Sequence, residues 1–209
     1  MQVVNLRKKL IDLLNKEFQL YGIDEFTYPI FYNLRIGLRF ELGMEIIEDE
    51  DEYINESVRR ACNIFNDVFA ADDDILLVID TTPDKELKQK LLNAIMQRVR
   101  IKLNDKKLNK ASNKCDTYFY RYIYFLKGRN FPSTSIFKRI AQSDFGKGKN
   151  YCNSVYIFNL RINVLFHMYD DRGIDLIAAD KDILKPFYKK LNHMLLDYDR
   201  TRMSNLFEN

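Results

Sequence analysis

The chain has 209 residues, of which 46% are hydrophobic and 13% aromatic. This composition is ample for a core and excludes global disorder. The length suits one domain over residues 1–209, or one domain to which a helix at residues 1–20 is appended. The net charge of +3 conceals a polarity, because residues 1–80 carry a net charge of −9 and residues 81–209 a net charge of +12. Such asymmetry can steer a charged partner, unless the two halves pack together and cancel.

The cysteines predict a reducing compartment. Cys62, Cys115 and Cys152 are odd in number, widely spaced and without a CxxC pair, which is typical of free thiols in a cytoplasmic protein. The N-terminus lacks the apolar stretch of a signal peptide, and no window approaches the roughly 18 apolar residues that span a bilayer. The cysteines and two histidines form no zinc pattern, so we expect neither a metal nor a cofactor.

In the first half of the chain, hydrophobic periodicity predicts alternating helices and strands. The helices are expected at residues 3–20, at 53–69 after an acidic run, and at 87–99 after the helix-start signal at Pro83. The strands are expected at 34–42, where apolar residues alternate with Arg35, Arg39 and Glu41, and at 75–79, a continuous apolar run typical of a strand covered on both faces.

In the second half, strands predominate. After a Lys- and Asn-rich connection, we expect a long strand at 117–126, a short helix at 133–140, strands at 155–160, 164–169 and 174–178, and a long closing helix at 183–198. The last three strands form a β-meander. The order of elements predicts an α+β fold, in which helices pack on a mixed or largely antiparallel sheet.

Several strings of this chain resemble one bacterial family, domain of unknown function 3885. In the C-terminal half they are Ile136-Phe137-Lys138, Asp144-Phe145, Val155 to Asn159, Leu165 to Gly173 and Leu196 to Arg200; Arg35 to Gly43 fits the family's N-terminal half. The resemblance covers most of the chain. It implies a bacterial protein, associated loosely with small cytosolic proteins near toxin loci, and it brings no assigned activity or catalytic residue.

The string Asp170-Asp171-Arg172-Gly173 has two interpretations. As a tight hairpin, it uses the positive φ that glycine allows and an aspartate that bonds the backbone two residues on. As a binding site, Asp170, Asp171, Arg172 and Asp175 form a polar cluster at a sheet end, where Arg172 pairs with a carboxylate or binds an anion. Adjacent strand residues point to opposite faces, which argues against a metal shared by Asp170 and Asp171.

A second candidate surface lies on the long strand. Tyrosines alternate along one of its faces, at Tyr118, Tyr120, Tyr122 and Tyr124. They predict either a half-buried face with aromatic partners or a recognition surface, since tyrosine is enriched at binding hot spots.

Two further features have simpler interpretations. His167 lies within an apolar strand and is predicted to be a core residue. The acidic run at Glu45 and Glu48–Glu52 is typical of a solvated helix start, or else it mimics phosphate and covers a basic active site.

These patterns favour a binding protein over an enzyme. We expect a macromolecule-binding protein, an immunity or antitoxin-like inhibitor whose partner is another protein, because a polarised charge and a tyrosine-rich strand accompany no catalytic motif. One alternative is a small enzyme, whose pocket would contain at least three of His167, Asp170, Asp171, Arg172 and Asp175. The other is a nucleic-acid-binding protein that uses the basic C-terminal half.

Overall fold

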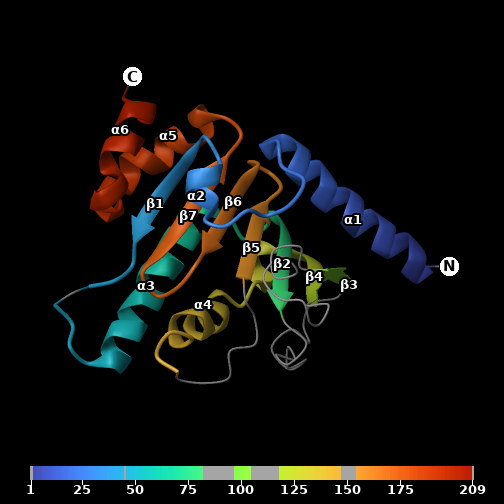
Figure 1. Ribbon diagram of the computed structural model, residues 1–209, viewed down its shortest axis with the longest axis horizontal. Coiled ribbons are helices and arrows are strands. Elements are labelled where there is room, and N and C mark those ends of the chain that lie inside the picture. Colours follow the sequence, from blue (N-terminus) through green and yellow to red (C-terminus); the bar gives the residue numbers. More distant parts are fainter. Residues whose placement is uncertain (1, 45, 82–96, 105–117, 147–153, 209) are drawn as a thin grey trace, which may run out of the picture.

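The computed structural model describes residues 2–44, 46–81, 97–104, 118–146 and 154–208 (Figure 1). The helices are α1 (Gln2–Tyr21), α2 (Ile30–Asn33), α3 (Glu50–Val68), α4 (Ser133–Gln142), α5 (Lys181–Lys190) and α6 (Arg200–Phe207), with 3-10 turns η3 (Gly128–Asn130), η4 (Asn192–Met194) and η5 (Asp197–Asp199). The strands are β1 (Gly37–Glu41), β2 (Asp74–Thr81), β3 (Gln97–Asn104), β4 (Tyr118–Lys127), β5 (Ser154–Asn159), β6 (Val164–Met168) and β7 (Gly173–Ala178). The α+β prediction is confirmed.

The described strands form one antiparallel sheet in the order β1-β7-β6-β5-β2-β4-β3. The predicted meander β5-β6-β7 is present, and it lies between β1 and β2. The apolar run of β2 is paired on both sides, by β5 and β4, and Ile75 to Ile79 are all buried. One prediction was wrong: residues 97–99, expected to end a helix, begin β3, and residues 82–96 of that segment lie outside the described part.

Different helices cover the two faces of the sheet. Phe166 of β6 packs against Phe65 of α3 and Phe137 of α4. The next residue, His167, points to the opposite face, because side chains alternate along a strand. On that opposite face Tyr21 of α1 contacts Phe158. Figure 1 shows α1 beside β4 and β3, and α5 with α6 beside β1.

The predicted N-terminal helix packs on the sheet through buried residues, which are Leu10, Leu14 and Phe18. The predicted closing helix was too long: α5 ends at Lys190, and two 3-10 turns separate it from α6. Between the turns, Leu195 bridges to Phe40 and Leu196 donates to the carbonyl of Arg39. This segment covers the outer edge of β1, an edge that would otherwise expose unpaired backbone groups.

Gly173 is essential for a reason other than the predicted one. It begins β7, and it is not among the glycines with positive φ. Instead, an added Cβ would lie 1.9 Å from the hydroxyl oxygen of Tyr169 and 2.8 Å from the carbonyl oxygen of Phe40. The glycine is therefore required by the close approach of an aromatic side chain and a neighbouring strand.

We predict that Gly173→Ala lowers the free energy of unfolding by about 1 to 3 kcal/mol, because the ring of Tyr169 must move. In a Tyr169→Ala background the added methyl meets one obstacle instead of two, and the same substitution should cost clearly less. Urea unfolding of the four proteins of this cycle measures the coupling. An equal cost in both backgrounds would contradict the steric explanation.

Candidate functional site

A buried ion pair joins β1 to β7 at the end of the sheet next to the 169–172 turn. Arg39 and Asp175 are directly opposite in the strand register. The Nε of Arg39 lies 2.7 Å from Oδ1 of Asp175, and its Nη2 lies 3.0 Å from Oδ2, so the pair is bidentate. The residues are 8% and 1% exposed. The sequence put Arg39 on the strand face opposite the apolar residues, and in the structure α2 and η5 cover that face.

Aromatic rings and a second carboxylate complete this ion-pair network. The guanidinium of Arg39 lies 4.7 Å from the ring centroids of Phe31 and Tyr32, and 5.0 Å from that of Tyr169. Its Nη1 lies 3.6 Å from Asp199, which accepts a hydrogen bond from the hydroxyl of Tyr32 at 3.0 Å. We call Arg39, Asp175, Asp199 and Tyr32 the Arg39 network. It connects β1, β7, η5 and α2, which are far apart in the sequence.

The 169–172 turn is the predicted hairpin. Asp170 Oδ1 accepts from the backbone N–H of Arg172 at 2.8 Å, which is the predicted bond to the backbone two residues on. The other oxygen of Asp170 pairs with the guanidinium of Arg172. Asp171 is hydrogen-bonded by the hydroxyl of Tyr53. Burial raises the pKa of Asp171, and the nearby Asp170 and Asp144 add to the rise.

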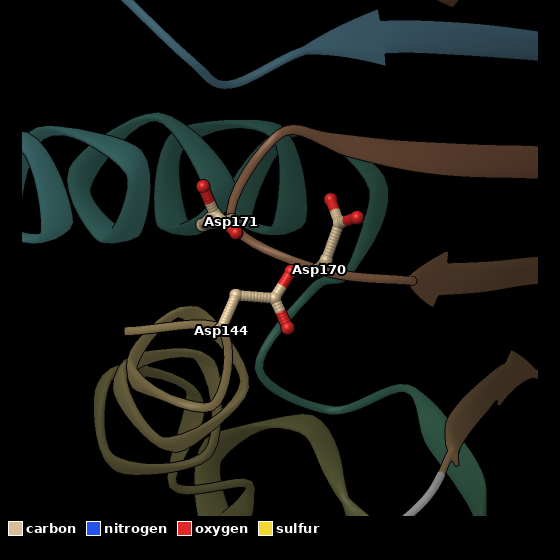
Figure 2. Close-up of side chains that lie close together, drawn as sticks. All are labelled: Asp144, Asp170 and Asp171. Atoms are coloured by element: carbon tan, nitrogen blue, oxygen red, sulfur yellow. The ribbon is translucent and has the colours of Figure 1, made fainter. Parts of the chain in front are cut away.

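Three carboxylates gather beside this turn (Figure 2). Oxygens of Asp144, Asp170 and Asp171 all lie within 4.8 Å of one another. The prediction that Asp170 and Asp171 point apart was wrong, because they lie in a turn and not in a strand. Among the described residues, this group could hold a divalent cation. Arg172 already neutralises Asp170, however, and Tyr53 already binds Asp171.

A cleft of about 460 Å³ opens next to the turn. Its lining residues are Arg39, Glu41, Gly43, Met44, Tyr53, Tyr169, Arg172 and Leu196. The enzyme interpretation required at least three of five predicted side chains in a pocket, and this cleft contains Arg172 alone of them. Asp144, Asp170 and Asp171 are not among the lining residues, although Asp171 is hydrogen-bonded to Tyr53. The cleft is therefore lined by aromatic and charged side chains that the catalytic hypothesis did not include.

Three exposed tyrosines lie around the Arg39 network. Tyr28, Tyr32 and Tyr198 are 53%, 44% and 86% exposed, and we call them the tyrosine surface. Tyr28 packs edge-on against His167. Tyr32 bonds to Asp199, and Tyr198 is the residue before Asp199. Burial is the main cause that raises the pKa of Tyr28 and of Tyr32, and neighbouring aspartates raise it further.

The tyrosines of the long strand, β4, which were candidates for a recognition surface, are not exposed where their side chains are described. Tyr124 is buried and belongs to the core. Tyr122 is half-buried and stacks near Tyr124, with ring centroids 6.4 Å apart. Tyr118 and Tyr120 belong to β4, but their side chains lie outside the described ones. Of the two that are described, Tyr122 fits the half-buried interpretation, whereas Tyr124 is fully buried.

His167 is a core residue, as its apolar strand indicated. It is 1% exposed, and its Nδ1–H donates to the carbonyl of Val155 at 2.9 Å. Its ring stacks on Tyr156, and its Nε2 has no hydrogen-bond partner. Burial is the largest influence on the pKa of His167 and lowers it. The imidazole is therefore neutral in the folded protein at neutral pH.

The sequence reasoning missed Arg39, Asp199, Tyr32 and Tyr53 as site residues. For two of them the sequence contained a signal that could have indicated a role in the site. Arg39 lies in the Arg35 to Gly43 string and Asp199 in the Leu196 to Arg200 string, which both carried the family resemblance. Those strings contain the two partners of one ion-pair network, joined only by the fold.

We predict that Arg39→Met lowers the free energy of unfolding by about 3 to 5 kcal/mol, because it leaves Asp175 buried without its partner. Arg172→Met should cost less than about 1 kcal/mol, because the side chain of Arg172 is 71% exposed. A further change, Asp175→Leu in the Arg39→Met protein, should recover part of the loss. Urea unfolding tests all three, and equal costs for Arg39→Met and Arg172→Met would contradict the assignment.

We also predict that His167 makes folding less favourable as the pH falls. Its folded pKa lies below the ordinary 6.5, so the unfolded chain binds the proton first and stability is lost below about pH 6.5. Glu17, with its pKa raised to about 7 mainly by burial, acts in the opposite direction over an overlapping range. The measured quantity is therefore the difference in unfolding free energy between wild type and His167→Gln from pH 7 to 5. That difference should change with pH, and a difference that stays constant from pH 7 to 5 would contradict the prediction.

None of the described helices is long and apolar enough to cross a membrane.

Comparison with known proteins places the chain in a family without an assigned activity. A curated relative, "Uncharacterized protein YnaE" of Bacillus subtilis (strain 168), is 24% identical over 213 residues, which cover 90% of this chain and 98% of the relative. No solved structure matches the chain. The family model "Domain of unknown function (DUF3885)" matches residues 10–199. This range contains the Arg39 network, the turn and the cleft, and the chain belongs to the DUF3885 family.

Proposed function

We propose that this protein binds another protein in the cytoplasm and acts as an immunity or antitoxin-like inhibitor. The observation that carries the proposal is the tyrosine surface on the Arg39 network. Tyrosine presents a large area at low entropic cost, and it is enriched where truncation costs most binding energy. Tyr198 is 86% exposed and Tyr28 is 53% exposed, which is unusual for large rings that serve only the fold.

The support under the surface favours binding without rearrangement. Tyr32 is held by Asp199 of η5, which together with Asp175 of β7 flanks Arg39, and Tyr28 packs on His167. Side chains that are already held in this way lose less conformational entropy when a partner binds. An inhibitor that acts by covering a site needs this property and no chemistry of its own. The proposal therefore replaces the strand tyrosines by Tyr28, Tyr32 and Tyr198 as the anchors.

The test is capture from the native host with matched variants. A tagged chain should retain a partner, and Tyr198→Ala should lose most of it, because removal of a hot-spot aromatic costs about 2 kcal/mol or more. Arg129→Ala is the control, since Arg129 is exposed near the far end of β4 and pairs with Asp72. Thermal unfolding of each variant confirms that the fold is intact.

An immunity role makes a further demand on the captured protein. Expressed alone it should arrest growth, and co-expression with the wild-type chain should restore growth more than co-expression with Tyr198→Ala. Recovery of the chain without a partner, or a captured protein that has no effect on growth, would contradict the inhibitor proposal. A low-salt mobility shift with nucleic acid in place of a protein partner would favour the nucleic-acid alternative.

A further inference from the structure

We infer that the cleft beside the turn binds a guanidinium group, presented as an arginine side chain by the partner protein. The inference deepens the proposed function and rests on it for the identity of the partner. It concerns a different set of residues from the tyrosine surface, although Arg39 belongs to both the network and the cleft lining. The volume of the cleft, about 460 Å³, falls within the range of pockets that bind small ligands.

The first argument is charge. Both arginines of the lining are already neutralised, Arg39 by Asp175 and Asp199, and Arg172 by Asp170. By contrast, Glu41 is exposed and its carboxylate has no hydrogen bond or ion pair with the described residues. The cleft therefore has a free negative charge and no free positive charge among its described lining residues. A cationic group would find an ion-pair partner there that the chain itself does not supply.

Acidic residues near the cleft add to its negative charge. Asp171 is hydrogen-bonded to the lining residue Tyr53, Asp144 lies close to Asp171, and exposed acids from Glu48 to Glu52 lie at the start of α3. The acidic run starts the helix as the sequence indicated, since Asp49 caps it by accepting from the N–H of Glu52 at 2.8 Å. Arg60 opposes this field nearby, and its guanidinium donates to the carbonyl oxygen of Glu41.

The second argument is the aromatic lining, which distinguishes guanidinium from other cations. Tyr53 and Tyr169 both line the cleft. Tyr169 already stacks on one guanidinium, that of Arg39 at 5.0 Å. Planar guanidinium stacks on aromatic rings and binds carboxylates in a fork, whereas ammonium and metal ions act as point charges. Met44 and Leu196 would contact the methylene chain of the incoming arginine.

The backbone of the cleft is shaped to stay open. An added Cβ at Gly43 would lie 2.7 Å from the hydroxyl oxygen of Tyr53. Tyr53 is fixed in turn by its hydrogen bond to Asp171, and burial with this carboxylate raises the pKa of Tyr53 to about 12. The Tyr53 hydroxyl therefore remains protonated and oriented at neutral pH. Its ring is a fixed wall against which a guanidinium can stack.

The experiment uses acetyl-Gly-Arg-Gly-amide as the probe and follows the Met44 methyl and Tyr53 ring signals by NMR. We expect saturable shifts with Kd of about 1 mM, and much weaker shifts from the citrulline peptide, which has the same shape without the charge. Glu41→Gln should weaken the arginine peptide about fivefold. The matched control Glu25→Gln removes an exposed acid elsewhere and should leave the Kd unchanged.

Equal binding of the citrulline peptide, or an unchanged Kd in Glu41→Gln, would overturn the inference. So would shifts at Asp144 and Asp170 without shifts at Met44, which would move the cation to the three-carboxylate group. The result of the peptide titration is independent of the result of partner capture. If a partner is captured but the peptide does not bind, the cleft assignment alone fails; if the peptide binds but no partner exists, the inhibitor proposal alone fails.

Discussion

A guanidinium and a carboxylate meet across β1 and β7 in a largely buried part of the sheet, and the arrangement of the site follows from that contact. Taking two charges out of water is costly, and a buried pair repays the cost only when its geometry is good and its remaining hydrogen-bonding groups are satisfied. Arg39 and Asp175 meet this condition through two short hydrogen bonds, with Asp199 and three aromatic rings around the guanidinium. An apolar pair at this position would also hold the two strands together. The ion pair does more, because it requires α2 and η5 to lie where they cover it.

This requirement connects two ends of the chain to one surface. Tyr32 reaches Asp199 across 167 residues of sequence, and Asp175 accepts a bond from the backbone of Phe31 as well. The tyrosine surface and the cleft therefore both adjoin one buried guanidinium, that of Arg39. A change in the ion pair would disturb both surfaces together, whereas a change at Tyr198 or Glu41 would disturb one.

The sequence predicted the framework well and the site poorly, for different physical reasons. Periodicity is a local signal, so the helices α1 and α3, the buried strand β2 and the meander were all predictable. The 169–172 hairpin was also predictable, because Asp170 bonds to a backbone group only two residues away. Strand β3 was missed, since Val99, Ile101 and Leu103 alternate with Arg and Lys in a segment where a helix had been extended too far. Arg39 could not be placed, because alternation assigns a charged residue to solvent and cannot show that another segment covers that face.

The same limit explains the tyrosines. Tyr122 and Tyr124 were selected for their spacing, but β4 lies inside the sheet between β2 and β3, and Tyr124 is part of the core. The exposed tyrosines are isolated in the sequence, and only the fold brings them around one network. Gly173 makes a related point, because its role depends on the position of the Tyr169 ring and not on its own backbone angles.

The most direct measurement of the central claim is solvent exchange at the Nε–H of Arg39, observed by NMR in the protein without a partner. A buried donor in a fixed ion pair exchanges only when the surrounding structure opens. The account predicts exchange as slow as that of the backbone amides of β7, and much faster exchange at the exposed Arg172, which also donates to a carboxylate. Exchange at Arg39 as fast as at Arg172 would contradict the claim that a buried ion pair organises this site.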